Sequence, residues 1–221
     1  MNAVDHLKEI RTKVPANVKI IAVSKTKAAS EIELLYREAG QRFFGENKVQ
    51  ELETKHAILP ADINWHFIGH LQTNKVKYIA PYVSLIQSVD SYRVIREINK
   101  EGIKNNRIIP CLLQFHIARE QAKYGFSFEE ATLMLNDNLF HELSNITLSG
   151  LMGMATYTTD MQQIRTEFVT LFRNFNSIKS QYFAQQPDFC EISMGMTDDY
   201  QMAIEEGSTI VRIGSGIFGE R

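Results

Sequence analysis

Lys25 is the residue of this chain whose type and position most clearly suggest chemistry. It follows Ser24 at the end of the apolar run Ile-Ile-Ala-Val at positions 20–23, which has the composition of a buried strand. An ammonium group is strongly hydrated and costly to remove from water, so a lysine at the mouth of such a strand is unusual. A desolvated lysine amine can lose its proton near neutral pH and attack an aldehyde or ketone, which forms a Schiff base.

The C-terminal part of the sequence supplies a complementary feature. A second apolar run, residues 210–213, opens into the loop Gly-Ser-Gly-Ile-Phe-Gly at positions 214–219. Backbone N–H groups in a loop of small residues are suited to hold a phosphate. An amine at one strand end and a phosphate loop at another predict a phosphorylated aldehyde as the ligand, and pyridoxal phosphate is the obvious candidate.

Composition excludes several classes of partner. The chain has 221 residues, 44% of them hydrophobic, which is enough for one sizeable core. Its formal net charge of -2 provides no basic field for nucleic acid or an anionic membrane. We find no run long enough to span a membrane and no secretory signal, so we expect a cytoplasmic protein. Cys111 and Cys190 both lie in apolar sequence and are interpreted as buried reduced thiols.

His66 and His70 have the spacing of a zinc-binding pair, but only if they lie on a helix. Residues 63–70 have the pattern of a strand followed by a loop, so the two imidazoles would not share a helical face. No nearby carboxylate or cysteine completes a ligand set. We therefore predict no metal site, and we expect His66 to point into the fold or to pair with a polar neighbour.

Short β-rich runs alternate along the chain with amphipathic helical patterns. Strands are predicted at about 20–25, 42–44, 63–68, 84–87, 107–115, 146–151, 189–193 and 209–213. Helices are predicted at about 2–14, 30–39, 48–58, 74–80, 91–100, 127–136, 161–182 and 198–206. Eight alternating units with continuous apolar strands favour a closed (β/α)8 barrel with an extra N-terminal helix, formed by one domain of residues 1–221. An open doubly wound sheet is the alternative.

Polar residues gather where the predicted strands end. Lys25, Asn47, His70, Ser193 and the loop beginning at Gly214 each closely follow a strand. In a barrel these positions converge at one mouth, although they are scattered in sequence. The loops after the last strands are also where such barrels commonly bind phosphate.

An ordered set of motifs connects this pattern to a known family. The motifs are Ala-Val-Ser-Lys-Thr (22–26), Phe-Gly-Glu-Asn (44–47), Trp-His-Phe-Ile-Gly (65–69), Leu-Gln-Thr-Asn-Lys (71–75), Gly-Leu-Met (150–152), Ser-Met-Gly-Met-Thr-Asp-Asp (193–199) and Val-Arg-Ile-Gly-Ser-Gly-Ile-Phe-Gly (211–219). Together they resemble the pyridoxal phosphate homeostasis protein family, also called the proline synthetase co-transcribed homologue family. That family is similar to the barrel domain of alanine racemase standing alone.

The resemblance implies that Lys25 forms the Schiff base with pyridoxal phosphate. Lys27, the nearest rival amine, is expected in the loop beyond it. Arg212 resembles the arginine that donates to the pyridine nitrogen of the cofactor. Because an arginine stays protonated, it cannot accept a proton from a pyridinium, and the cofactor becomes a weaker electron sink.

The resemblance also assigns a phosphate cradle. Ser193, Gly214 and Ser215 are expected to bind the phosphate together with a backbone N–H of Met194, since hydroxyls and amides donate without adding charge. Asn47 resembles a residue near the ring face or the phenolic oxygen of the cofactor. A helix N-cap is the alternative role of Asn47.

We expect a carrier of pyridoxal phosphate rather than a turnover enzyme, with no catalytic residue. Racemase chemistry of the alanine racemase type needs a second acid or base, a tyrosine that the related enzymes take from a separate domain of a partner subunit. This chain has no residues left over for that domain, so proton transfer on both faces of a substrate lacks one group. Storage or delivery of the cofactor in intracellular homeostasis fits the sequence better than turnover does. We expect apo-enzymes that depend on pyridoxal phosphate to be the recipients, and we expect the protein to be a monomer.

Two other functions remain open on the sequence. The chain could be a racemase or lyase of low rate, with Tyr157, Tyr124 or His116 as the second base. It could also be a binding module without cofactor, in which the helix at 161–182 recruits a protein partner. Packing on the sheet explains the periodicity of that helix better.

Overall fold

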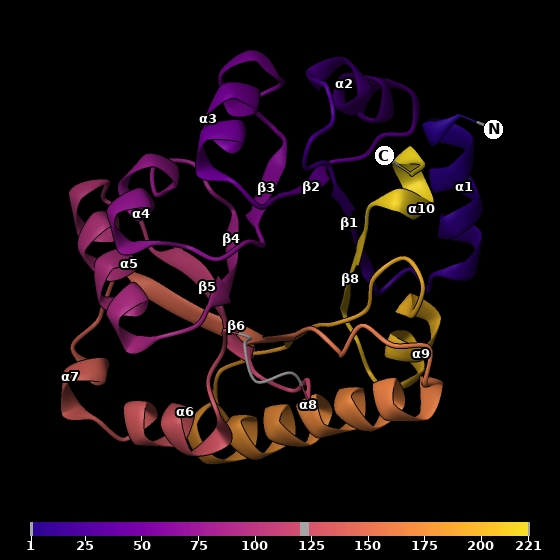
Figure 1. Ribbon diagram of the computed structural model, residues 1–221. Helices are drawn as coiled ribbons and strands as arrows, with labels where there is room; N and C mark the ends of the chain where they lie inside the picture. The colour runs from indigo at the N-terminus through magenta and orange to yellow at the C-terminus, as the bar shows by residue number, and fades with distance from the viewer. Residues whose placement is uncertain (1, 120–123, 221) are drawn as a thin grey trace.

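The computed structural model of the protein describes residues 2–119 and 124–220. In this part of the chain, eight parallel strands close into a barrel in sequence order, and β8 pairs with β1. Figure 1 shows the helices arranged around the outside of the strands. The predicted (β/α)8 barrel is therefore confirmed, and the open sheet is excluded.

The strands are β1 Lys19–Val23, β2 Phe43–Glu46, β3 Asn64–Phe67, β4 Leu85–Val89, β5 Ile109–Phe115, β6 Ile146–Gly153, β7 Glu191–Ser193 and β8 Ile210–Ile213. The helices are α1 Ala3–Lys13, α2 Ala29–Glu38, α3 Val49–Ile58, α4 Thr73–Ile79, α5 Tyr92–Lys104, α6 Phe128–Leu135, α7 Asn138–His141, α8 Met161–Tyr182, α9 Tyr200–Glu205 and α10 Ser215–Phe218. Sequence patterns predicted neither α7 nor α10, because a single turn of helix is too short to show a period. The glycines at 214, 216 and 219 also indicate a loop where α10 lies.

The inside of the barrel has two layers of different polarity. Its floor is an apolar cluster made by Ile21, Leu85, Leu112, Met152 and Ile210. Side chains two residues further along a strand point to the same side, one layer nearer the C-terminal end. On β4, β5 and β8 these next positions hold buried Gln87, Gln114 and Arg212. A polar layer therefore lies between the apolar floor and the mouth.

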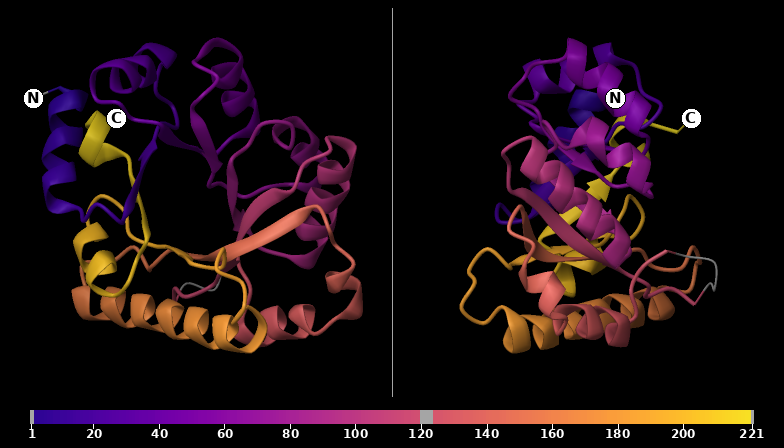
Figure 2. Two further views of the ribbon diagram at one scale, coloured as in Figure 1. Left: turned by 180° about the vertical axis from the view of Figure 1, so that it is seen from behind. Right: turned by 90° about the vertical axis from the view of Figure 1, so that its left-hand side faces the viewer.

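The outer face of the strands packs against the helices. Figure 2 shows α8 as the longest of these, running along one side of the barrel. Its apolar stripe is buried at Ile164, Phe168, Leu171, Phe175 and Ile178. Packing on the barrel thus explains the periodicity of α8, as predicted.

The N-terminal helix α1 lies beside the C-terminal helix α10 (Figures 1 and 2). The ring nitrogen Nδ1 of His6 is 3.1 Å from the carbonyl oxygen of Ile217. An Asn2–Asp5 capping box begins α1, with Asp5 N–H donating to Asn2 Oδ1 at 3.0 Å. The extra N-terminal helix of the prediction is confirmed, and it steadies the segment that follows β8.

The two cysteines differ in exposure. Cys111 is buried in β5, and burial raises the pKa of its thiol. Cys190 is exposed, so the prediction of two buried thiols was wrong for this residue. Neighbouring Phe189 is fully buried, and the alternation of side chains along an extended segment turns Cys190 to the other side. Among the described residues, no helix has both the length and the apolar character needed to cross a membrane.

Candidate functional site

Lys25 lies in a tight turn directly after β1. The N–H of Lys27 donates to the carbonyl of Ser24 at 3.0 Å, and Thr26 has a φ of 66°. A positive φ at the third position is the signature of a type II turn. The Lys25 side chain is partly buried and forms no hydrogen bond or ion pair within the described residues. Its amine is therefore uncommitted.

The two rival amines are engaged elsewhere. Lys27 Nζ donates to the carbonyl of Phe218 at 3.3 Å and lies 3.9 Å from Glu31. Lys55 Nζ donates to the carbonyl of Ser24 and to two carboxylates at 2.6 to 2.7 Å. Of these three lysines, Lys25 has the amine that is left for a ligand.

Arg212 on β8 is buried inside the barrel, with 4% of its surface exposed. Its Nη1 donates to Ser193 Oγ at 2.6 Å, and its Nη2 donates to the carbonyl of Gly153 at 3.0 Å. Burial lowers the pKa of Arg212 to about 10, and the charge of Asp199 opposes this shift. The guanidinium therefore remains protonated at neutral pH, and it has further N–H donors for a ligand.

A buried polar chain continues from Arg212 across the barrel. Ser193 Oγ donates to Gln87 Oε1 at 2.6 Å, and Gln87 Nε2 donates to His66 Nδ1 at 2.7 Å. His66 must therefore accept on Nδ1 and carry its proton on Nε2. Burial lowers the pKa of His66 to about 3, so the imidazole is neutral. The expectation that His66 pairs with a polar neighbour inside the fold is confirmed.

Asn47 follows β2 and presents an unused acceptor. Its Oδ1 is buried and has no hydrogen-bond partner in the described part of the chain. Gly69 allows the next loop to approach closely, because a Cβ there would lie 2.2 Å from the carbonyl oxygen of Asn47. The N-cap position of α3 is Lys48, so the helix-cap role considered for Asn47 is wrong. A buried acceptor without a partner fits a site that receives a donor from a ligand.

The loops after β7 and β8 meet at Thr197. Ser215 Oγ donates to Thr197 Oγ1 at 3.1 Å, and the N–H of Gly216 is 3.2 Å from the same oxygen. Ser215 is exposed and Gly214 partly buried at the start of α10. This cluster of hydroxyl and amide donors has the composition expected of a phosphate cradle.

The structure places Ser193 and Met194 deeper than Ser215. The single hydroxyl proton of Ser193 is donated to Gln87, and the N–H of Met194 donates to the carbonyl of Ile210 at 3.2 Å. Ser193 is thus brought together with Arg212 rather than with the loop at 215. The phosphate-binding roles of these two residues stay predictions.

Polar side chains also surround the mouth near β3 and β4. His70 Nδ1 is 2.7 Å from Asp90 Oδ2, and the His70 ring stacks on Tyr124 at a centroid distance of 3.8 Å. His66 and His70 therefore have separate partners. Within residues 2–119 and 124–220, no group of three or more His, Cys, Asp or Glu side chains is arranged to hold a metal ion.

Sequence patterns missed several residues of this region, namely Gln87, Thr197, Glu46, Glu51 and Lys55. A polar residue inside an apolar strand was the available signal for Gln87 and Glu46. Glu51 and Lys55 are spaced as an ordinary i,i+4 pair on a helix surface, so nothing in the sequence marks them as buried.

Residues 2–221 match the protein family described as the alanine racemase N-terminal domain. The chain is 38% identical over 204 residues to the "Pyridoxal phosphate homeostasis protein" of Aquifex aeolicus, over 92% of this chain and 87% of that protein. The solved structure of PipY from Synechococcus elongatus with pyridoxal phosphate bound is 30% identical, has a TM-score of 0.89, and is matched over 99% of this chain and 100% of that one. Alanine racemase from Bartonella henselae shares the fold at a TM-score of 0.73 and 17% identity, over 99% of this chain and 62% of that one.

Proposed function

The chain belongs to the pyridoxal phosphate homeostasis protein family, which is built on the alanine racemase N-terminal domain, and from this we propose that it binds pyridoxal phosphate reversibly on Lys25. Its role is the intracellular homeostasis of that cofactor, by storage or by delivery to enzymes that need it. The PipY structure, which contains the cofactor, supports the same ligand here.

One observation carries the proposal: an uncommitted amine and a buried guanidinium lie at the ends of neighbouring strands. Ile21 on β1 pairs with Arg212 on β8, and Lys25 lies four residues beyond Ile21 at the mouth. Asn47, with its unused buried oxygen, follows the next strand, β2. When bound, pyridoxal phosphate supplies an aldehyde that condenses with the Lys25 amine with loss of water, and an aromatic ring whose nitrogen can accept a hydrogen bond.

Arg212 supports holding the cofactor rather than deep carbanion chemistry. Its guanidinium is protonated and anchored on two sides, so it can only donate to the ring nitrogen. A ring nitrogen without a proton withdraws electrons weakly from a bound amino acid. The cofactor is therefore retained without being strongly activated.

The anionic tail of the cofactor is assigned to the loops that meet at Thr197. Ser215 provides an exposed hydroxyl, and Gly214 and Gly216 provide backbone groups next to it. These hydroxyl and amide donors carry no charge of their own, which suits reversible binding of a phosphate.

A second candidate function is a slow amino-acid racemase or lyase. The observation in its favour is Tyr124, whose ring stacks on His70 near the ends of β3 and β4. A phenol there could serve as the second acid or base. Chiral analysis after incubation of the loaded protein with alanine or serine tests this function, and sustained turnover lost in Lys25→Ala would favour it over the carrier.

The remaining features of the function are also proposals. Residues 1–221 act as one domain, in the cytoplasm and as a monomer, and apo-enzymes dependent on pyridoxal phosphate are the recipients. Co-incubation of the loaded protein with such an apo-enzyme, followed by recovery of that enzyme's activity, tests delivery.

Spectroscopic titration tests the proposed function. Purified protein is titrated with pyridoxal phosphate, and the absorbance band of the bound cofactor is recorded. The affinity for the cofactor is measured separately by equilibrium dialysis. Lys25→Ala is expected to lose the absorbance band and to bind more weakly, whereas Lys27→Ala keeps both. Equal colour and equal affinity in Lys25→Ala would refute the assignment.

A further inference from the structure

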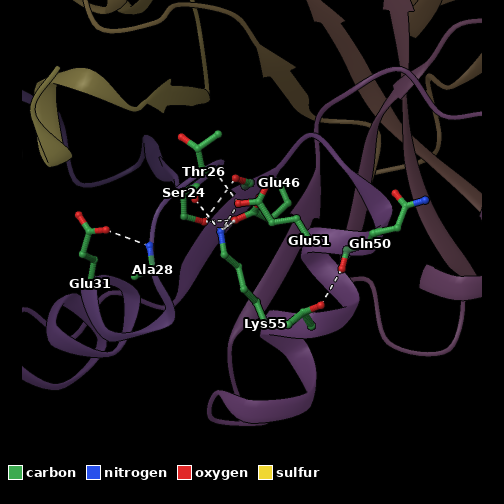
Figure 3. A network of polar contacts seen from close by, with 10 residues as sticks. Ser24, Thr26, Ala28, Glu31, Glu46, Gln50, Glu51 and Lys55 are labelled. Carbon is green, nitrogen blue, oxygen red and sulfur yellow. Dashed lines mark hydrogen bonds and ion pairs between the residues drawn. The ribbon is translucent and has the colours of Figure 1, made fainter. Parts of the chain in front are cut away.

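Glu46, Glu51 and Lys55 form a charged cluster directly beneath the turn that carries Lys25, with Glu46 and Lys55 buried and Glu51 partly buried (Figure 3). We propose that this cluster, here called the turn clamp, positions Lys25 by fixing the backbone on both sides of it. The inference rests on the proposed attachment of the cofactor to Lys25, and it adds three residues that act through the backbone.

The turn needs support because its third position is strained. Type II turns usually place glycine or asparagine where φ is positive, but here the residue is Thr26, at a φ of 66°. A β-branched residue in this region is a genuine outlier. The left-handed conformation is unfavourable for an L-residue, because its Cβ comes too close to the following carbonyl oxygen. Such strain persists when surrounding contacts enforce it, and it clusters at functional sites.

The turn clamp provides those contacts on each side of Lys25. After it, the N–H of Thr26 donates to Glu51 Oε1 at 2.5 Å. Before it, Lys55 Nζ donates to the carbonyl of Ser24 at 2.7 Å, and Ser24 Oγ donates to Glu46 Oε1 at 2.6 Å. Figure 3 shows the Lys55 ammonium between Ser24 of the turn, Glu46 of β2 and Glu51 of α3. Both neighbours of Lys25 are held, while its own amine stays uncommitted.

Lys55 is held too completely to react itself. Its side chain is 6% exposed, and its three N–H donors go to Ser24, Glu46 and Glu51. Glu46 is fully buried, and burial raises the pKa of its carboxyl although Lys55 and Ser24 oppose the shift. The cluster thus places two acceptors and one donor around the turn without adding a second nucleophile.

General stabilisation is a weak explanation for such a cluster. A buried ion pair is often no more stable than well-packed apolar residues of similar volume, because its charges must be desolvated. The cluster instead fixes the conformation of the backbone, because its hydrogen bonds end on Ser24 and Thr26, the two residues that flank Lys25. Holding a reactive group in one geometry raises its effective concentration toward the group it attacks. The turn clamp therefore determines how fast Lys25 is labelled and how much label goes to Lys27.

The test uses Glu51→Ala, because the Glu51 side chain is 22% exposed and its loss leaves Lys55 paired with Glu46. Glu51→Gln is the conservative variant, since its amide oxygen can still accept from Thr26. Glu53→Ala is the matched control on the same helix, where the charge lies near Tyr82 instead of the turn. The fold of each variant is checked by its unfolding temperature.

Two readouts separate positioning from stability. Amide hydrogen exchange at Thr26 is measured without cofactor, and the rate of borohydride-fixed labelling by pyridoxal phosphate is measured by mass spectrometry at Lys25 and Lys27. Glu51→Ala is expected to speed exchange at Thr26 about tenfold and to slow labelling of Lys25 about tenfold, as the loss of a hydrogen bond to a charged group would do. Glu51→Gln should recover most of the rate, and Glu53→Ala should match the natural chain.

The outcomes distinguish the two proposals. If the natural chain is not labelled on Lys25, the proposed function fails, while exchange at Thr26 still reports whether Glu51 holds the turn. If the natural chain is labelled on Lys25 and Glu51→Ala is labelled at the same rate, the turn clamp does not position Lys25. Unchanged exchange at Thr26 in Glu51→Ala would overturn the proposal as well.

Discussion

Two buried polar regions support the two ends of the candidate site, and they are built differently. The turn clamp under Lys25 consists of charged groups that are close in sequence and that bond to backbone atoms. The buried polar chain under Arg212 consists of a hydroxyl, an amide and a neutral imidazole, and it joins β8, β7, β4 and β3. One region contains several charges, whereas the other ends on a single permanent charge.

The difference follows from what each region holds. A reactive amine must itself remain free, so the structure fixes the backbone around Lys25 instead of its side chain. A guanidinium that only donates hydrogen bonds can be held directly, so Arg212 itself donates to the Ser193 hydroxyl and to the carbonyl of Gly153. Removing a residue of the charged region leaves an unpaired charge in the interior. Removing a residue of the neutral region leaves polar groups without a hydrogen bond, which lowers the free energy of unfolding less.

Lys55→Met is expected to have the largest effect on stability. It leaves Glu46 and Glu51 without their shared cation, and removing one partner of a buried ion pair costs about 3–5 kcal/mol. Urea denaturation measures the loss in the free energy of unfolding. Lys13→Met breaks an exposed i,i+4 pair with Glu9 and should leave stability unchanged. Similar small effects of both variants would mean that the turn clamp is not a buried charged cluster.

Ser193→Ala breaks the neutral chain at its centre. Arg212 Nη1 and Gln87 Oε1 each lose a partner, so the free energy of unfolding should fall by about 2–4 kcal/mol. The affinity for pyridoxal phosphate should fall with it, because Arg212 is less well held. Ser180→Ala on the exposed face of α8 serves as the control. An unaltered affinity in Ser193→Ala would show that the chain does not hold Arg212 in place.

His66 should make stability depend on pH. Its pKa is about 3 in the folded protein and near 6.5 when unfolded, so the unfolded state binds the extra proton between these values. Stability is therefore lost as pH falls below about 6.5, by about 2 kcal/mol at pH 5. Denaturation at pH 7 and pH 5 should show that His66→Gln removes this part of the loss, whereas His141→Gln at an exposed site does not. An equal loss in all three proteins would contradict a neutral, buried His66.

Thr26→Gly should have the smallest effect, and in the opposite direction. Glycine adopts a positive φ without strain, but it also loses more backbone freedom on folding. The net result is a gain of up to about 1 kcal/mol in the free energy of unfolding. Asn106→Gly, at a φ of 50°, is the matched control and should change less, because asparagine tolerates this conformation. A loss of stability in Thr26→Gly would argue against strain in the turn.

The sequence was sufficient to predict the barrel and the end of it at which the candidate residues gather. Lys25 and Asn47 closely follow their strands and Arg212 lies near the end of β8, so the alternation of strands and helices brings all three toward the C-terminal end of the barrel. Contacts across the barrel were not predictable in this way. Gln87 meets Ser193 because the strands close into a ring and stagger, and neither strand's own pattern contains that register.

Burial of charge was the other feature that sequence reasoning missed. Glu51 and Lys55 have the spacing of a solvated helical pair, and Glu46 follows a glycine at the end of a short strand. Their burial depends on how α3 packs against the turn after β1, which is tertiary information. Orientation within an extended segment is also tertiary information. It decides that Cys190 is exposed, and that the Met194 N–H donates to the carbonyl of Ile210.

Peptide mapping of the borohydride-reduced complex tests the central claim most directly. The protein is saturated with pyridoxal phosphate, reduced, digested and analysed by mass spectrometry. We predict that the label resides on the peptide containing Lys25, that Lys25→Ala removes it, and that Lys27→Ala leaves it in place. Stoichiometric label on Lys27 or Lys55 in the natural chain, with none on Lys25, would contradict it.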